Sequence, residues 1–219
     1  MGQFPSKSVT DLVEEALDTL QIAPPPNAVT LLEKYILEII RWGRLTNLTG
    51  AADPMDFARG PLFDALTLVP SLEQEGSLVD VGSGGGLPGI PAAILAPMVR
   101  ITLVEPRSKR ASFLRHVVHL LEIDAETVES RDEDLPNGSW NGAVAQAVWP
   151  APKWLDRARR LVAPQGAIYV LAARPFDKKD LPAGAIIERE AHYARPFDDA
   201  PRYAARIRMG VRDLTTDQS

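Results

Sequence analysis

The chain has 219 residues, enough for one domain of about 150 residues and an additional segment. Hydrophobic residues make up 45% and charged residues 24%, and no apolar run reaches the ~18 residues of a membrane span, so we expect a cytoplasmic globular protein with no membrane contact. The absence of cysteine excludes disulfides and thiolate metal sites, and a net charge of -5 disfavours phosphate partners unless the cations are unevenly spread.

Residues 1–72 read as a helical extension. Ser8 and Asp11 have the spacing of a capping box, in which each side chain bonds the other residue's backbone N–H at a helix start. We expect three helices, with a polar turn that carries Trp42 after the second and an interruption near Gly60–Pro61 in the third. Their expected bounds are residues 8–20, 27–40 and 56–72.

From Ser77 onward, short apolar strands alternate with amphipathic helices, which predicts an α/β fold with a mostly parallel sheet. The last two strands alternate in a two-residue rhythm and are expected to close the sheet as an antiparallel pair. We assign residues 73–213 to this domain and 214–219 to a disordered tail. The expected strands are 77–80, 100–105, 127–130, 143–148, 167–172, 186–193 and 203–211, and the helices between them are 88–96, 109–121 and 152–162.

A glycine-rich loop follows the first strand, which ends at Asp80. The dinucleotide fingerprint needs glycine at its first, third and sixth positions, and counting from Gly82 the sixth is Leu87. A phosphate-binding P-loop needs a lysine that this loop lacks. The remaining pattern, Asp-x-Gly-x-Gly-x-Gly, looks like motif I of class I S-adenosylmethionine (SAM) methyltransferases, and the Asp80 carboxylate suits the ammonium group of SAM. The alternative is a βα turn that binds nothing. The candidate cofactor residues here are Asp80, Gly82, Ser83, Gly84, Gly86 and Leu87.

Two further stretches are candidates for the nucleoside part of that ligand. Glu105 ends the second strand, where a carboxylate can accept hydrogen bonds from both hydroxyls of a ribose. The alternative is an ion pair of Glu105 with Arg107 or Lys109. The loop after the third strand contains Asp132 and Glu133, which in this topology border the adenine; the alternative is a solvated acidic loop.

Gln146 ends the fourth strand, where such enzymes place groups that face the methyl acceptor, and its amide offers both a donor and an acceptor. It is equally compatible with a plain polar strand end. His116 and His119 lie three residues apart on a predicted helix with no further ligands nearby, so we expect no metal site. Two arginine clusters are either solvated surface or contacts to phosphates. They comprise Arg157, Arg159, Arg160, Arg195, Arg202, Arg206, Arg208 and Arg212.

Over residues 30–175 the chain resembles the small-subunit rRNA 7-methylguanosine methyltransferase family, called RsmG or GidB. The resemblance is carried by Trp42 with the segment 45–49, by the run from Asp80 to Pro91, and by Glu105 followed by the segment 109–114. It implies a Rossmann-like class I SAM-dependent methyltransferase fold with a seven-stranded sheet, and SAM as cofactor. It also implies N7-methylation of a guanine in 16S rRNA and the small ribosomal subunit or its rRNA as partner. We expect a monomer.

The resemblance also implies roles for individual residues. Asp64 aligns with the aspartate that precedes the family's glycine loop, and Glu133 matches the glutamate of its Arg-x-Glu motif. Three departures lie on the acceptor side. The chain has Pro61 where the family has histidine, Gln146 where it has arginine, and Ala172-Ala173 where it has lysine-glycine, with Arg174 as a substitute. The catalytic candidates are therefore Gln146, Asp64 and Arg174. The alternatives are a methyltransferase for a small molecule or a protein, and a non-catalytic SAM-binding module.

Overall fold

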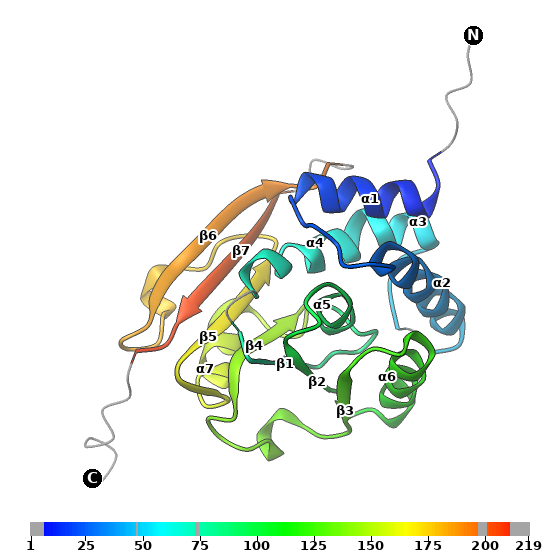
Figure 1. The fold of residues 1–219 in the computed structure, drawn as a ribbon. Helices are drawn as coiled ribbons and strands as arrows, with labels where there is room; N and C mark the ends of the chain where they lie inside the picture. Colours follow the sequence, from blue (N-terminus) through cyan, green and yellow to red (C-terminus); the bar gives the residue numbers. More distant parts are fainter. Residues whose placement is uncertain (1–6, 47, 73–74, 197–200, 211–219) are drawn as a thin grey trace.

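The computed structural model describes residues 7–46, 48–72, 75–196 and 201–210, and these form a seven-stranded sheet in the order β3-β2-β1-β4-β5-β7-β6 (Figure 1). Strands β1 to β5 are parallel, whereas β7 pairs antiparallel with both β5 and β6. The expected fold class and the antiparallel closing pair are confirmed. The strands are β1 Ser77–Val81, β2 Arg100–Val104, β3 Ala125–Val128, β4 Trp140–Gln146, β5 Val162–Ala172, β6 Ile186–Ala194 and β7 Pro201–Arg208.

The helical extension begins as expected, since Ser8 and Asp11 form both hydrogen bonds of the capping box. The third expected helix is broken by a π-helical turn at Ala58–Leu62, because Pro61 has no N–H to donate to the helix. The helices in chain order are α1 Val9–Thr19, α2 Ala28–Thr46, α3 Pro54–Phe57, α4 Phe63–Leu66, α5 Gly89–Leu95, α6 Ser108–Leu121 and α7 Ala151–Ala158, with short 3-10 turns at Val69–Ser71, Asp132–Asp134 and Lys178–Asp180.

The polar turn expected after residue 40 is wrong, because α2 continues to Thr46. Trp42 lies in this helix, packs against Phe113 and stacks on His116 of α6, with ring centroids 5.5 Å and 5.3 Å apart. These contacts with α6 continue the apolar stripe of α2 beyond Ile40. Trp42 is therefore a packing residue, and His116 also bonds Glu38 of α2 through Nε2 at 3.2 Å.

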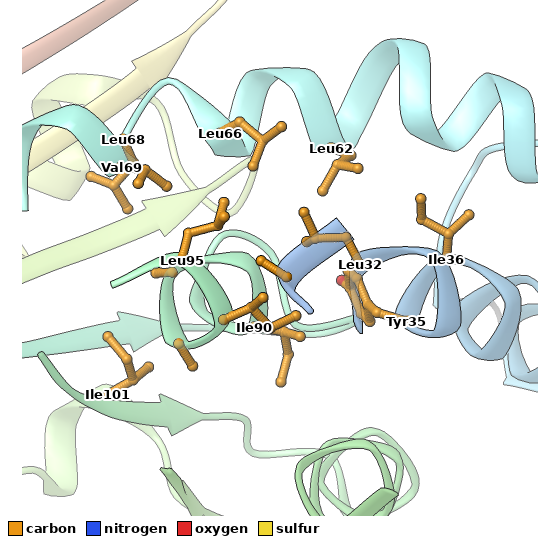
Figure 2. Close-up of a cluster of buried hydrophobic side chains, with 14 of the residues drawn as sticks. Leu32, Tyr35, Ile36, Leu62, Leu66, Leu68, Val69, Ile90, Leu95 and Ile101 are labelled. Atoms are coloured by element: carbon orange, nitrogen blue, oxygen red, sulfur yellow. The ribbon is translucent and has the colours of Figure 1, made fainter. Parts of the chain in front are cut away.

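The sheet separates two apolar clusters, and neighbouring β1 residues Leu78 and Val79 face opposite ones, as strand geometry requires. Helices α1, α2, α5 and α6 contribute to the first cluster and α7 to the second (Figure 1). Figure 2 shows side chains of α2, of the segment 58–71 and of α5 meeting in the first cluster, among them Leu32, Tyr35, Ile36, Leu62, Leu66, Ile90 and Leu95. The helical extension thus packs directly on the helix that follows the glycine loop.

Several strand and helix ends differ from the expected ones. The residues 163–166 bulge out between the paired positions Val162 and Ala167, and Gln165 adopts a positive φ of 63°. Because Ala-Pro-Gln-Gly reads as a turn, Val162 was assigned to the preceding helix although it begins β5. The proposed tail 214–219 lies outside the described residues.

Candidate functional site

A cavity of about 490 Å³ opens at the carboxyl edge of the sheet, where the strand order reverses between β1 and β4. Ligands of open α/β sheets bind at this type of switch point. Six separate segments contribute to its wall, so the cavity exists only in the folded chain. Its lining residues are Ile39, Leu48, Thr49, Gly50, Phe57, Pro61, Gly82, Ser83, Gly84, Gly85, Leu87, Glu105, Pro106, Arg107, Arg110, Gln146, Ala147 and Val148.

The glycine loop forms the floor of the cavity. Backbone N–H groups of Gly82 and Ser83 both donate to the carbonyl of Val104, which anchors the loop on β2. Gly84 has a φ of 53°, and a Cβ atom there would face Arg110 at 3.5 Å with no closer neighbour. Glycine adopts this positive φ without strain, and its lack of a side chain lets a ligand approach the backbone closely.

Glu105 lies at the end of β2, is 3% exposed and lines the cavity. Its Oε2 accepts the N–H of Gly84 at 3.0 Å, and its Oε1 accepts the backbone N–H of Arg107 at 2.9 Å. Within the described residues Glu105 forms no ion pair with Arg107 or Lys109, and its contact with Arg107 is through the backbone N–H alone. Each carboxylate oxygen has a second lone pair, which leaves the group able to accept two further hydrogen bonds from a vicinal diol.

Asp80 is completely buried beneath the loop and is not part of the cavity lining. Its Oδ2 accepts the N–H of Gly89 at 3.0 Å, while Oδ1 has no hydrogen-bond partner among the described residues. Burial raises the pKa of Asp80 from its ordinary 3.8 to about 8. The expected direct contact with an ammonium group is therefore not available in this geometry; Asp80 instead anchors the first residue of α5.

Gln146 lines the cavity from the end of β4. Its Nε2 donates to the carbonyl of Pro61 at 3.2 Å, which ties β4 to the π-helical turn. Since a carbonyl can only accept, this bond fixes the orientation of the amide. The Oε1 atom is buried and has no partner among the described residues, so the side chain retains an unused acceptor at the cavity wall.

The other expected site residues lie outside the cavity lining. Asp64 is held by two arginines of the β6–β7 region, with its Oδ2 at 2.5 Å from Arg195 Nη2 and 3.1 Å from Arg202 Nε. Arg174 is exposed. Gly86 is buried within the loop, where a Cβ would lie 2.5 Å from Ile90.

The acidic loop after β3 is also tied to protein groups. Arg157 of α7 donates to both carboxylate oxygens of Asp132 at 2.6 Å and 2.8 Å, and to Glu133 at 2.9 Å. These hydrogen bonds raise the pKa of Arg157 above its usual range. Neither acid belongs to the lining, so the structure does not bring them together with Glu105 and the glycine loop.

Sequence reasoning missed the wall that the helical extension supplies. Ile39 of α2, Leu48, Thr49 and Phe57 line the cavity, and their role depends on contacts with a loop more than 25 residues further along the chain. The one sequence feature that indicated this wall is the segment 45–49, which belongs to the motif that carries the family resemblance.

The cavity offers both an anionic acceptor and cations to a ligand. The buried carboxylate of Glu105 can accept hydrogen bonds from ribose hydroxyls, loop backbone and apolar side chains suit the rest of a nucleoside, and Arg107 and Arg110 also line the cavity. Among the described residues no group of three or more potential ligands could hold a metal ion. Within the same residues, none of the helices is both long and apolar enough to cross a membrane.

Residues 28–181 match the model of the family GidB, rRNA small subunit methyltransferase G. A ribosomal RNA small subunit methyltransferase G of Cellvibrio japonicus (strain Ueda107) is 34% identical over 166 residues, which is 73% of this chain and 75% of that protein. The protein of the same name from Cronobacter sakazakii (strain ATCC BAA-894) is 32% identical over 191 residues, 85% of this chain and 92% of that protein.

Solved methyltransferase structures share the fold. The N-methyltransferase NodS of Bradyrhizobium japonicum WM9, in complex with S-adenosyl-L-homocysteine, matches with a TM-score of 0.55 and 13% identity over 78% of this chain and 98% of that one. The Burkholderia thailandensis 1,6-didemethyltoxoflavin-N1-methyltransferase matches with a TM-score of 0.54 and 16% identity, over 86% and 91%. At these identities the likeness concerns the fold alone. The family match covers most of the chain, and the protein therefore belongs to the GidB family, rRNA small subunit methyltransferase G.

Proposed function

We infer that this methyltransferase binds SAM in the cavity over the glycine loop and methylates N-7 of a guanine in small-subunit rRNA. The observation that carries the cofactor assignment is the buried carboxylate of Glu105, which lines the cavity with acceptor capacity to spare. Family membership supports the RNA substrate, because the relatives are named for small-subunit ribosomal RNA.

When bound, SAM supplies an electrophilic methyl group on a positively charged sulfur. Glu105 would accept hydrogen bonds from the ribose hydroxyls, and the backbone of the glycine loop would support the amino-acid part. Gln146 would face the acceptor with its amide held by the Pro61 carbonyl. Guanine N-7 already carries its lone pair, so the chain needs no general base. Its contribution is alignment of the two reactants and exclusion of water.

Asp64 and Arg174 were candidates for catalytic roles. In this proposal Asp64 is a positioning residue, because its ion pairs connect α4, next to the Pro61 turn, with the β6–β7 region. The helical extension, 1–72, belongs to the functional unit together with the sheet domain, 73–213, since it supplies one wall of the cavity.

Methyl transfer can be measured with small ribosomal subunits purified from cells that lack this protein. Incubated with methyl-labelled SAM, they should incorporate label into their RNA, and cleavage chemistry specific for 7-methylguanosine should locate it. Small subunits from cells that contain the protein are the control and should take up little label. SAM binding without any label in the RNA would contradict the rRNA assignment and favour another acceptor.

A further inference from the structure

We propose that three exposed arginines along the carboxyl edge of the sheet, Arg107, Arg131 and Arg174, bind phosphates of the RNA backbone on both sides of the cavity. We refer to them as the edge arginines. The inference rests on the proposed function, because it takes RNA as the substrate. It differs from the sequence-based expectation, which assigned phosphate contacts to the arginine clusters of α7 and the C-terminal strands.

The strand register brings the edge arginines into one row. Val104 of β2 pairs with Val128 of β3, and Arg107 and Arg131 each follow the paired residue by three positions. Leu171 of β5 pairs with the cavity residue Gln146, and Arg174 follows Leu171 by the same number of positions. Because parallel strands end at one edge, all three arginines lie in loops at the carboxyl edge of the sheet, and Arg107 also lines the cavity.

The row has the length of a short RNA segment. In the strand order, β3 and β5 are separated by four strand spacings, which is about 19 Å at about 4.8 Å per spacing. This is the length of about five nucleotides in a stacked strand at about 3.4 Å each. The cavity lies between Arg107 on one side and Arg174 on the other, so a nucleotide that enters it would have phosphates on both sides.

Most arginines of the α7 cluster and of the C-terminal cluster form ion pairs with carboxylates of the protein. Arg206 bonds Glu75 at 2.7 Å and also pairs with Glu188, and Arg208 pairs with Glu188 as well. The same holds for Arg157, Arg159, Arg195 and Arg202, whereas Arg160 donates to backbone carbonyls and to Asn137. Arg212 lies outside the described residues. Transfer of Arg157, Arg202 or Arg206 to a phosphate would weaken ion pairs with partly buried carboxylates, whereas the partner of Arg159 is exposed.

The edge arginines have no such partner. In the part of the chain that the structure describes, none of their guanidinium groups forms a hydrogen bond or an ion pair. The acids next to Arg131 are paired with other cations only in part, since the single guanidinium of Arg157 binds both Asp132 and Glu133. Arg115 binds Glu129, which leaves Asp134 as the one acid of that loop without a described partner. The guanidinium groups of the edge arginines are therefore available to RNA phosphates, although the whole chain has a net negative charge.

The test measures the affinity of the full-length protein for in vitro transcribed small-subunit rRNA as a function of salt. The variant Arg131→Gln/Arg174→Gln is compared with the matched control Arg100→Gln/Arg189→Gln, which removes two exposed arginines away from the carboxyl edge. The edge variant should bind about tenfold more weakly at low salt, and its slope of log affinity against log salt should be smaller by about 2. The control should retain the wild-type slope, and Arg174→Gln alone should reduce it by about 1.

Calorimetry with SAM accompanies each variant; Arg131 and Arg174 lie outside the cavity lining, so their replacement should leave SAM affinity at the wild-type value. Unchanged SAM affinity together with the reduced salt slope supports the inference. Equal slopes for the edge variant and the control would overturn the inference and leave the proposed function intact. Failure of the wild-type protein to bind the rRNA at any salt concentration would overturn both.

Discussion

At the scale of single residues, Glu105 is the group whose chemistry decides whether a nucleoside binds. Glu105→Gln keeps the size of the side chain and removes its charge, so the hydrogen bonds to a ribose lose their charge assistance. Loss of such bonds costs about 1.5–3 kcal/mol, which predicts a SAM affinity lower by a factor of about 10 to 150 in calorimetry. The control Glu126→Gln changes an exposed glutamate of β3 and should bind like wild type. An unchanged affinity for Glu105→Gln would refute the ribose assignment.

Because Asp80 is buried, we expect it to make the free energy of unfolding of this protein depend on pH. Its folded-state pKa of about 8 lies above its ordinary 3.8, so between these values the folded state binds more protons than the unfolded state. The free energy of unfolding therefore falls as the pH rises from about 4 to about 8, by at most about 1.4 kcal/mol per pH unit from this group.

Asp80→Asn removes this titration and keeps an oxygen to accept the N–H of Gly89. Relative to wild type, the variant should gain stability as the pH is raised from 5 to 8. Urea unfolding at several pH values measures this difference. A stability difference that is constant over this range would show that Asp80 is not protonated in the folded protein at neutral pH.

At the scale of elements, the ion pairs of Asp64 hold α4 against the β6–β7 region. The side chains of Asp64, Arg195 and Arg202 are each less than 20% exposed, so Asp64→Asn removes a partly buried negative charge that contacts both arginines. We expect the free energy of unfolding to fall by about 3 kcal/mol, at the lower end of the range for broken buried pairs. Asp156→Asn is the control: it breaks the exposed 3.5 Å pair with Arg159 and should change stability by less than about 1 kcal/mol. Similar losses in both variants would contradict the structural role of Asp64.

At the scale of the whole molecule, features with a local signal were predictable and features built from distant contacts were not. Alternating apolar strands and helices were sufficient for the fold class, and the glycine spacing with Glu105 located the cavity. The partners of Asp64 lie 131 and 138 residues away, and no local pattern indicates them. Asp132 was likewise assigned to the ligand from the position of its loop after the third strand, whereas no local pattern indicates its ion pair with Arg157, 25 residues away.

The helical extension precedes the glycine loop in the chain, so the residues that contact the loop are synthesised before the loop itself. The Tyr35 hydroxyl donates to the carbonyl of Gly85 at 2.7 Å, and Ile39 stands where a Cβ of Gly85 would otherwise lie, at 2.5 Å. The scaffold of the loop is therefore translated about fifty residues before the loop itself. A shortened chain that begins at β1 would keep the residues of all seven strands, but its glycine loop would lack the contacts of Gly85 with Tyr35 and Ile39.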